Sequence, residues 1–217
     1  MMTRREAGLG LLSAASLVAG GVLAAAAAAP IDLPKPTLSS KPLAEALRDR
    51  RSIREFADRP LPLPLLSGLL WSAFGINRPR SGDRTAPSWR HAIETEVYLA
   101  LPDGVWRYDP GGHRLMPHLA LDMRAQTGTQ DFVGRAPLDL VYVADGIRMG
   151  NVAAEEKRLY AFADTGFVGQ NVYLFCAAEG LATVFRGSVD RDALGRSLQL
   201  PAEHFVTFAQ TVGFPKG

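Results

Sequence analysis

Apolar and polar residues repeat along the chain with two different periods, which predict both helices and strands. Apolar residues spaced three or four positions apart predict helices at 43–50, 65–74, 149–162, 166–179 and 190–198. Strict alternation or a short apolar run predicts strands at 94–101, 105–108, 138–144, 181–185 and 205–212, with 138–144 at the centre of the sheet. Because helices and strands interleave without a regular strand–helix–strand rhythm, the pattern favours an α+β fold over a doubly wound sheet.

The first thirty residues follow neither period. Arg4 and Arg5 precede an uncharged stretch at 7–29 that is rich in small residues. A basic start, an apolar stretch and a small-residue end predict an export signal peptide over 1–29, with an uncleaved membrane anchor as the alternative. The arginine pair resembles a twin-arginine signal, which exports folded proteins. We therefore expect a periplasmic or exported bacterial protein without stable membrane insertion after signal cleavage.

The chain as a whole has the composition of one globular domain. Over 217 residues, 47% are apolar and 21% are charged, and 24 basic against 22 acidic residues give a net charge of +2, which indicates no nucleic-acid partner. A single cysteine excludes an internal disulfide, and the four histidines lack the spacing of metal ligands, so we expect no metal site. A Pro-rich, extended leader at 30–42 precedes a domain at 43–217.

The densest chemical signal is Arg50-Arg51-Ser52-Ile53-Arg54, at the end of the first predicted helix. Guanidinium groups match phosphate oxygens two at a time, and a serine hydroxyl adds another donor. If the backbone leaves the helix here, Arg50, Ser52 and Arg54 converge on one ligand while Arg51 points away. The alternative is an ordinary basic helix end that complements the helix dipole.

Two other segments carry weaker signals for ligand binding. The loop at 84–88 can lay backbone and hydroxyl groups along a planar or sugar-like ligand. The strand at 181–185 lies between Gly180 and Gly187, and Gly187 would allow the backbone to approach a ring closely.

Two further features suggest chemistry that their context excludes. Asp164-Thr165-Gly166 matches the core of aspartic proteases, but that site requires a loop after a strand, and here the motif falls between two helical patterns. Cys176 lies in an apolar stretch of predicted helix, which indicates a buried structural thiol rather than a nucleophile.

Five short motifs along the chain occur in an order that carries a family resemblance. They are Arg50-Arg51-Ser52-Ile53-Arg54-x-Phe56, Thr85-Ala86-Pro87-Ser88, Gly166-x-x-x-Gln170-Asn171-x-x-Leu174, Gly180-Leu181-Ala182-Thr183 and Val212-Gly213-Phe214-Pro215. Together they resemble the FMN-dependent nitroreductase family, from about residue 43 to 216. Gly75-Ile76-Asn77-Arg78-Pro79 and the Ala-Pro-Ser loop are most similar to the branch that includes azoline dehydrogenases.

The resemblance implies a homodimer of α+β subunits, each with a mixed or antiparallel sheet flanked by helices, and two FMN sites at the interface. Arg50 and Ser52, beside Arg51, match the positions that hold the FMN phosphate, and Arg54 matches a cation near the pyrimidine edge. The resemblance also assigns Pro87 and Ser88 to the loop beneath the ribityl chain and ring, and His91 to a position where many members have Asn. It assigns the backbone of Arg186 and Gly187 to flavin N5. Lys216 is the basic candidate near the phosphate.

The function that the resemblance implies is electron transfer from NAD(P)H through flavin N5 to a nitroaromatic, quinone-like or similar planar small molecule. A cation at Arg54 would favour the negative charge of the reduced ring. No catalytic side chain is required, because the chemistry belongs to the flavin. Two alternatives stay open: a flavin-dependent dehydrogenase of an organic, azoline-like substrate, and a flavin-binding protein without turnover.

Overall fold

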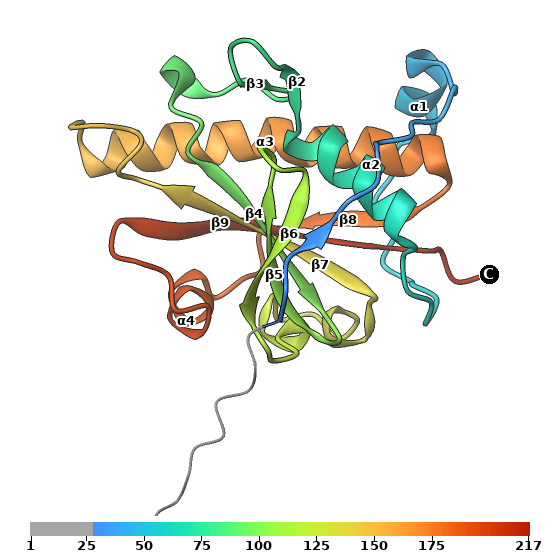
Figure 1. Cartoon of the computed structure of the whole chain (residues 1–217). Coiled ribbons are helices and arrows are strands. Elements are labelled where there is room, and N and C mark those ends of the chain that lie inside the picture. Colours follow the sequence, from blue (N-terminus) through green and yellow to red (C-terminus); the bar gives the residue numbers. More distant parts are fainter. Residues whose placement is uncertain (1–27) are drawn as a thin grey trace, which may run out of the picture.

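The computed structural model describes residues 28–217, so nearly all of the predicted export signal at 1–29 lies outside the described residues. The described chain has the predicted α+β architecture, with helices packed on an antiparallel sheet (Figure 1). The seven strands have the order β1-β6-β5-β4-β7-β9-β8. Their bounds are Ile31–Asp32 (β1), Thr95–Leu101 (β4), Gly104–Asp109 (β5), Arg114–Leu119 (β6), Leu138–Asp145 (β7), Ala182–Arg186 (β8) and His204–Gly213 (β9).

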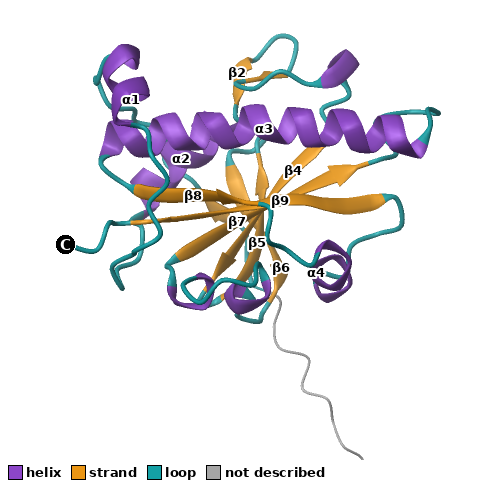
Figure 2. Ribbon diagram, turned by 180° about the vertical axis from the view of Figure 1, so that it is seen from behind, coloured by secondary structure: helices purple, strands orange, loops and turns teal. Residues whose placement is uncertain are grey.

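Four helices surround this sheet. The long helix α3 runs across one face of it beside α2, while α4 lies on the other side (Figure 2). The helices are Leu43–Asp49 (α1), Leu63–Phe74 (α2), Ala154–Glu179 (α3) and Arg191–Ser197 (α4). A two-stranded hairpin of β2 (Ile76–Arg78) and β3 (Asp83–Arg84) and three short 3₁₀ helices at Trp89–His91, Arg124–Gln126 and Val133–Arg135 complete the described elements.

Strand β7 is central, as its apolar sequence predicts. It pairs with β4 on one side and β9 on the other, and all eight of its residues are buried. Because successive side chains point to opposite faces, Leu140 and Tyr142 join the core beneath α2 and α3, and Val141 and Val143 join the core beneath α4.

The two helical patterns predicted at 149–162 and 166–179 form one continuous helix, α3, so the predicted break is wrong. Glycine lowers helix propensity by about 1 kcal/mol, which is too little to end a helix whose next turns bury Val168 and Val172 in the core. Asp164-Thr165-Gly166 therefore lies inside a helix, and the Thr165 hydroxyl bonds to the carbonyl of Ala161. Cys176 is fully buried, and burial raises the pKa of its thiol.

The N-terminal segment at 30–42 is extended, and part of it packs onto the domain. Ile31 and Asp32 pair with β6, and Leu33 is a core residue that donates its N–H to the carbonyl of His113. The pattern had predicted neither β1 nor β6. Between residues 28 and 217, no helix is both long and apolar enough to cross a membrane.

Candidate functional site

The segment after α1 leaves the helix and runs in an extended form beside β8. The Ile53 N–H donates to the carbonyl of Thr183 at 2.9 Å, and the Ala57 N–H donates to the carbonyl of Phe214 at 2.9 Å. Phe56 also pairs with Pro215 as an isolated bridge. These bonds hold the basic cluster at the edge of the sheet.

Arg50 and Ser52 converge on one side chain, Tyr173 of α3. The Tyr173 hydroxyl accepts a hydrogen bond from the backbone N–H of Phe185 at 2.9 Å and lies 2.7 Å from Ser52 Oγ. Either hydroxyl can donate in the bond between Ser52 and Tyr173. When Tyr173 donates, the proton of the exposed Ser52 hydroxyl is free for a ligand. The Arg50 guanidinium lies over the Tyr173 ring, 5.1 Å from its centroid.

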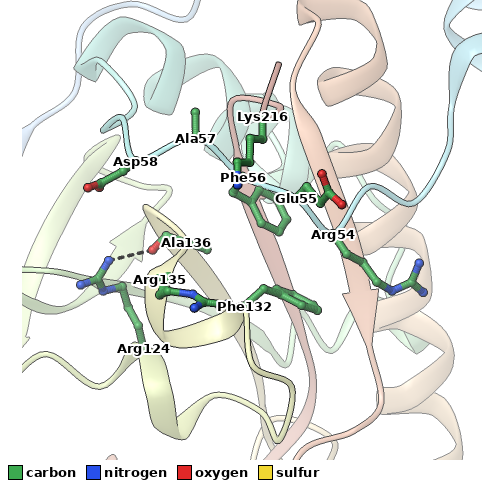
Figure 3. Close-up of a pocket in the computed structure, with 10 residues that line it drawn as sticks. All are labelled: Arg54, Glu55, Phe56, Ala57, Asp58, Arg124, Phe132, Arg135, Ala136 and Lys216. Atoms are coloured by element: carbon green, nitrogen blue, oxygen red, sulfur yellow. Dashed lines mark hydrogen bonds between the residues drawn. The ribbon is translucent and has the colours of Figure 1, made fainter.

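The neighbouring arginines take different directions. Arg51 is exposed and donates from Nε to the carbonyl of Asp49 at 3.0 Å, away from Tyr173. Arg54 is exposed at the rim of a cavity of about 630 Å³, and its guanidinium points away from Arg124 and Arg135 on the opposite wall (Figure 3). Arg50 and Ser52 therefore lie together and Arg51 lies apart, as the sequence predicts. Arg54 instead lines a cavity whose walls include neither Arg50 nor Ser52, so the predicted convergence of all three is not observed in the single chain.

The cavity beside Arg54 is lined by four basic and two acidic residues around two phenylalanines. The full lining is Arg54, Glu55, Phe56, Ala57, Asp58, Arg124, Phe132, Arg135, Ala136 and Lys216 (Figure 3). The Lys216 backbone N–H donates to the carbonyl of Glu55 at 3.2 Å, so the C-terminal end is fixed to this wall. An excess of basic groups favours an anionic ligand.

Gly187 directly follows β8 and is exposed, whereas the Arg186 side chain points into the protein. Arg186 Nη2 lies 2.8 Å from Asp139 Oδ1, and Nη1 donates to the carbonyl of Thr127 at 2.8 Å. Burial raises the pKa of Asp139 to about 6, and the Arg186 charge acts in the opposite direction. Only the backbone of Arg186 is therefore available to a ligand at this edge.

The second predicted segment lies elsewhere on the molecule. The backbone N–H of Trp89 donates to Asp164 of α3, nine residues before Tyr173, which corresponds to about 14 Å along the helix axis. In both Figures 1 and 2, α1 and the loop after β3 lie over opposite halves of α3. Pro87 and His91 are exposed, and the Ser88 hydroxyl donates to Glu94 at 2.8 Å. One chain therefore does not bring the two predicted segments together.

Sequence reasoning missed several residues of the site. Tyr173 sits between two members of the motif at 166–174, and its only signal was a hydroxyl inside an apolar stretch of helix. Phe132, Arg124 and Arg135 reach the cavity from a loop about 80 residues away from the basic cluster, and no local pattern indicates such a contact.

Comparison with known proteins identifies the family. The family model described as "Nitroreductase family" matches residues 47–214, which is most of the chain. The chain belongs to the nitroreductase family. A Methanocaldococcus jannaschii protein named as a candidate nitroreductase is 30% identical over 168 residues, which cover 73% of this chain and 84% of that protein.

Two solved structures of the nitroreductase fold extend the comparison. A crystal structure of a candidate nitroreductase from Ralstonia eutropha JMP134 is 42% identical, with a TM-score of 0.84, and covers 89% of this chain and 92% of its own. The NADPH:FMN oxidoreductase of Vibrio harveyi, complexed with NAD+, is 21% identical with a TM-score of 0.62 and covers 81% of this chain and 69% of its own. The predicted nitroreductase-like fold is confirmed, and the chain is an oxidoreductase of this family.

Proposed function

We propose that the chain binds FMN along residues 50–54 and transfers electrons from NAD(P)H to a nitroaromatic, quinone-like or similar planar acceptor. The observation that carries this proposal is the arrangement of Arg50 and Ser52 on Tyr173, whose hydroxyl accepts from the Phe185 N–H two residues before the exposed Gly187. Membership of the nitroreductase family and the likeness to an NADPH:FMN oxidoreductase support the same cofactors.

The residues present fit the phosphate of FMN. Ser52 would give its hydroxyl proton to the phosphate while the Tyr173 hydroxyl donates to Ser52 Oγ, since either hydroxyl of this pair can donate. Arg50 adds a guanidinium that is already oriented by the Tyr173 ring, so less side-chain freedom is lost on binding. Lys216, which is held to Glu55 in the wall of the cavity beside Arg54, adds positive charge from the C-terminal end.

The remaining residues act on the ring. FMN, when bound, supplies the two-electron chemistry that links a nicotinamide donor to the acceptor. The Arg54 cation would stabilise negative charge on the ring, and the backbone N–H of Gly187 would be the donor to the ring nitrogen. A Cβ added at Gly187 would make ordinary contacts with Phe208 at 3.7 Å and Arg191 at 4.0 Å, and glycine leaves that space free beside the backbone.

The proposal includes a homodimer in which each site takes residues from both copies. On α3, the outward side chains of Leu159 and Phe167 are 65% and 48% exposed, and on α1 those of Leu43 and Leu47 are 63% and 53% exposed. Exposed apolar side chains gathered on neighbouring helices favour burial against a second chain. A second copy on this face would bring the loop at 85–91, with Pro87, Ser88 and His91, to residues 50–54 of the first.

The proposal also places the mature protein in the periplasm. Its support is the sequence at 1–29, with two arginines before an uncharged stretch. An N-terminal sequence of the protein recovered from a periplasmic fraction tests this point, and an intact Met1 in the cytoplasm would contradict it.

The test of the flavin proposal is a visible spectrum of the purified protein, recorded before and after NADH or NADPH is added without oxygen. We expect the yellow absorbance of FMN, its loss on reduction, and its return when a quinone is added. Colourless protein that takes up no added FMN would refute the proposal. Bound flavin that neither nucleotide reduces would favour the dehydrogenase or the non-catalytic alternative.

A further inference from the structure

Two buried carboxyl groups lie at the base of the loop that carries Pro87, Ser88 and His91. Glu94, just before β4, is 0% exposed, and Asp164, in the middle of α3, is 5% exposed. Glu94 accepts a hydrogen bond from Ser88 Oγ at 2.8 Å, and Asp164 accepts one from the backbone N–H of Trp89 at 2.7 Å. Both carboxyl groups therefore hold the same loop, one from the sheet and one from the helix.

No cation neutralises this pair. Among residues 28–217, neither carboxyl has an arginine, lysine or histidine as an ion-pair partner. The basic residues around the loop contact other groups. Arg148 pairs with Glu96 and Asp145 and donates to the carbonyl of Ile93. The Arg90 guanidinium lies over the Trp89 ring, and His91 lies beside Asp83. The other polar or titratable neighbours are Thr95, whose hydroxyl is 3.4 Å from Glu94, and Tyr160, which stacks on Trp89.

Two buried carboxylates that face each other without a cation cannot both ionise cheaply, so such pairs retain a proton. Burial, followed by the hydrogen bond and charge of Asp164, raises the pKa of Glu94 to about 7, while the bond from Ser88 acts in the opposite direction. One proton shared between the two carboxyl groups satisfies both the charge and the geometry.

The backbone of the same loop is strained. Arg90, His91 and Ile93 have positive φ angles of 48°, 57° and 50°, and for a β-branched residue such as Ile93 this conformation is rare. The Ile93 N–H is held by Ser88 Oγ at 2.8 Å, and Ser88 in turn gives its only proton to Glu94. The strained conformation therefore depends on the carboxyl pair.

We propose that Glu94 and Asp164 share one proton and act as positioning residues that hold the loop at 86–93 in the form that contacts FMN. This inference rests on the proposed function, because the loop carries the predicted flavin contacts. Loss of the shared proton places two negative charges side by side at the base of the loop. The charges repel, the bonds to Ser88 and Trp89 weaken, and the strained backbone relaxes.

The direction of the pH effect follows from the raised pKa. The folded form binds the proton more tightly than the unfolded chain does, so the stabilisation is complete at low pH and is lost as pH rises through about 7. Both the order of the loop and the affinity for FMN should therefore decrease between slightly acidic and slightly alkaline pH.

Amide hydrogen exchange of the full-length protein without added flavin tests the loop directly. After correction for intrinsic exchange rates, we expect the loop peptides at 86–95 to lose protection by up to about tenfold per pH unit as pH rises toward the raised pKa of about 7. The loss should level off above that pKa, because the ordered and the opened loop have then both released the proton. Glu94→Gln and Asp164→Asn each remove the second charge, so their protection should not depend on pH. Glu155→Gln, an exposed carboxyl on α3, is the control and should behave as the wild type.

A wild-type loop whose corrected exchange is independent of pH would overturn the inference, as would an unchanged pH dependence in both variants. If neither variant folds, the infrared band of a protonated carboxyl in the wild-type protein decides the question. Its presence at neutral pH and loss above the raised pKa support the shared proton, and its absence at neutral pH excludes it.

A second arm measures the dissociation constant of FMN across the same pH range. We expect the affinity of the wild type to fall with pH more steeply than that of Glu94→Gln, since the variant retains only the titration of the phosphate. FMN affinity with the same pH profile in both proteins would refute the positioning role while the proposed function stands. No FMN binding at any pH would refute the proposed function, and hydrogen exchange would still test the proton pair.

Discussion

The buried ion pair between Asp139 and Arg186 provides a strong test of how the site edge is held in place. Asp139 is 0% exposed and Arg186 is 2% exposed. The Asp139 carboxylate accepts bonds from Arg186 Nη2 at 2.8 Å and Thr211 Oγ1 at 2.5 Å, and Arg186 also donates to the Thr127 carbonyl at 2.8 Å. Asp139→Leu leaves the guanidinium buried without its counter-ion, which costs about 3–5 kcal/mol of unfolding free energy.

The assay is chemical denaturation of the wild type, Asp139→Leu, Arg186→Met and the double variant. Because the double variant has no unpaired buried charge, we expect it to be more stable than Asp139→Leu, with a coupling free energy of about 1–3 kcal/mol. A loss below about 1 kcal/mol in Asp139→Leu, or additive effects of the two substitutions, would show that the pair does not link β7 to β8 across β9 in the way that the geometry indicates.

Three further predictions follow from particular contacts. Arg50→Ala should weaken FMN binding by about 1.5–3 kcal/mol, the usual contribution of a hydrogen bond to a charged group, whereas Arg51→Ala should change it by much less; a flavin titration compares the two. Gly169→Ala should destabilise the fold by about 1–3 kcal/mol in chemical denaturation, because its Cβ would overlap the Phe185 ring. Gly195→Ala is the control. Its new Cβ would lie 3.8 Å from Leu200, its nearest neighbour, so this variant should be neutral or stabilising in the same experiment. Phe167→Glu should convert the proposed dimer into monomers in sedimentation velocity without lowering the stability of the monomer, since that side chain is 48% exposed in the single chain; a dimer that persists would place the interface on another face.

Hydrophobic periodicity predicted the elements that are largely buried, and the strands at 138–144 and 205–212 and the helix at 65–74 match β7, β9 and α2 within a few residues. The helix at 43–50 also matches α1, although only Ala46 of its apolar residues is buried in the single chain. Strand β6 was missed because its interior residues are mostly half-buried, so it lacks a clear alternation of apolar and polar positions. The short strand β1 was missed because only two residues pair there.

The sequence by itself also determined the chemistry at the end of α1, because the cluster of arginines and serine is contiguous. It indicated that Arg50, Ser52 and Arg54 lie on one side and Arg51 on the other, since side chains alternate along an extended backbone. The structure brings Arg50 and Ser52 together, whereas Arg54 lines a separate cavity. The single buried thiol and the family resemblance likewise depended on residues that are close in the chain.

Only the tertiary structure decided which groups are free to bind a ligand. It shows that the Arg186 side chain is bonded to Asp139, that Ser88 donates to Glu94, and that the Ser52 hydroxyl pairs with Tyr173. Ser88 and Glu94 are 6 residues apart in the chain, whereas Ser52 and Tyr173 are 121 residues apart. Local patterns record which face of a helix or strand is buried, but hydrogen-bond partners depend on how those faces meet.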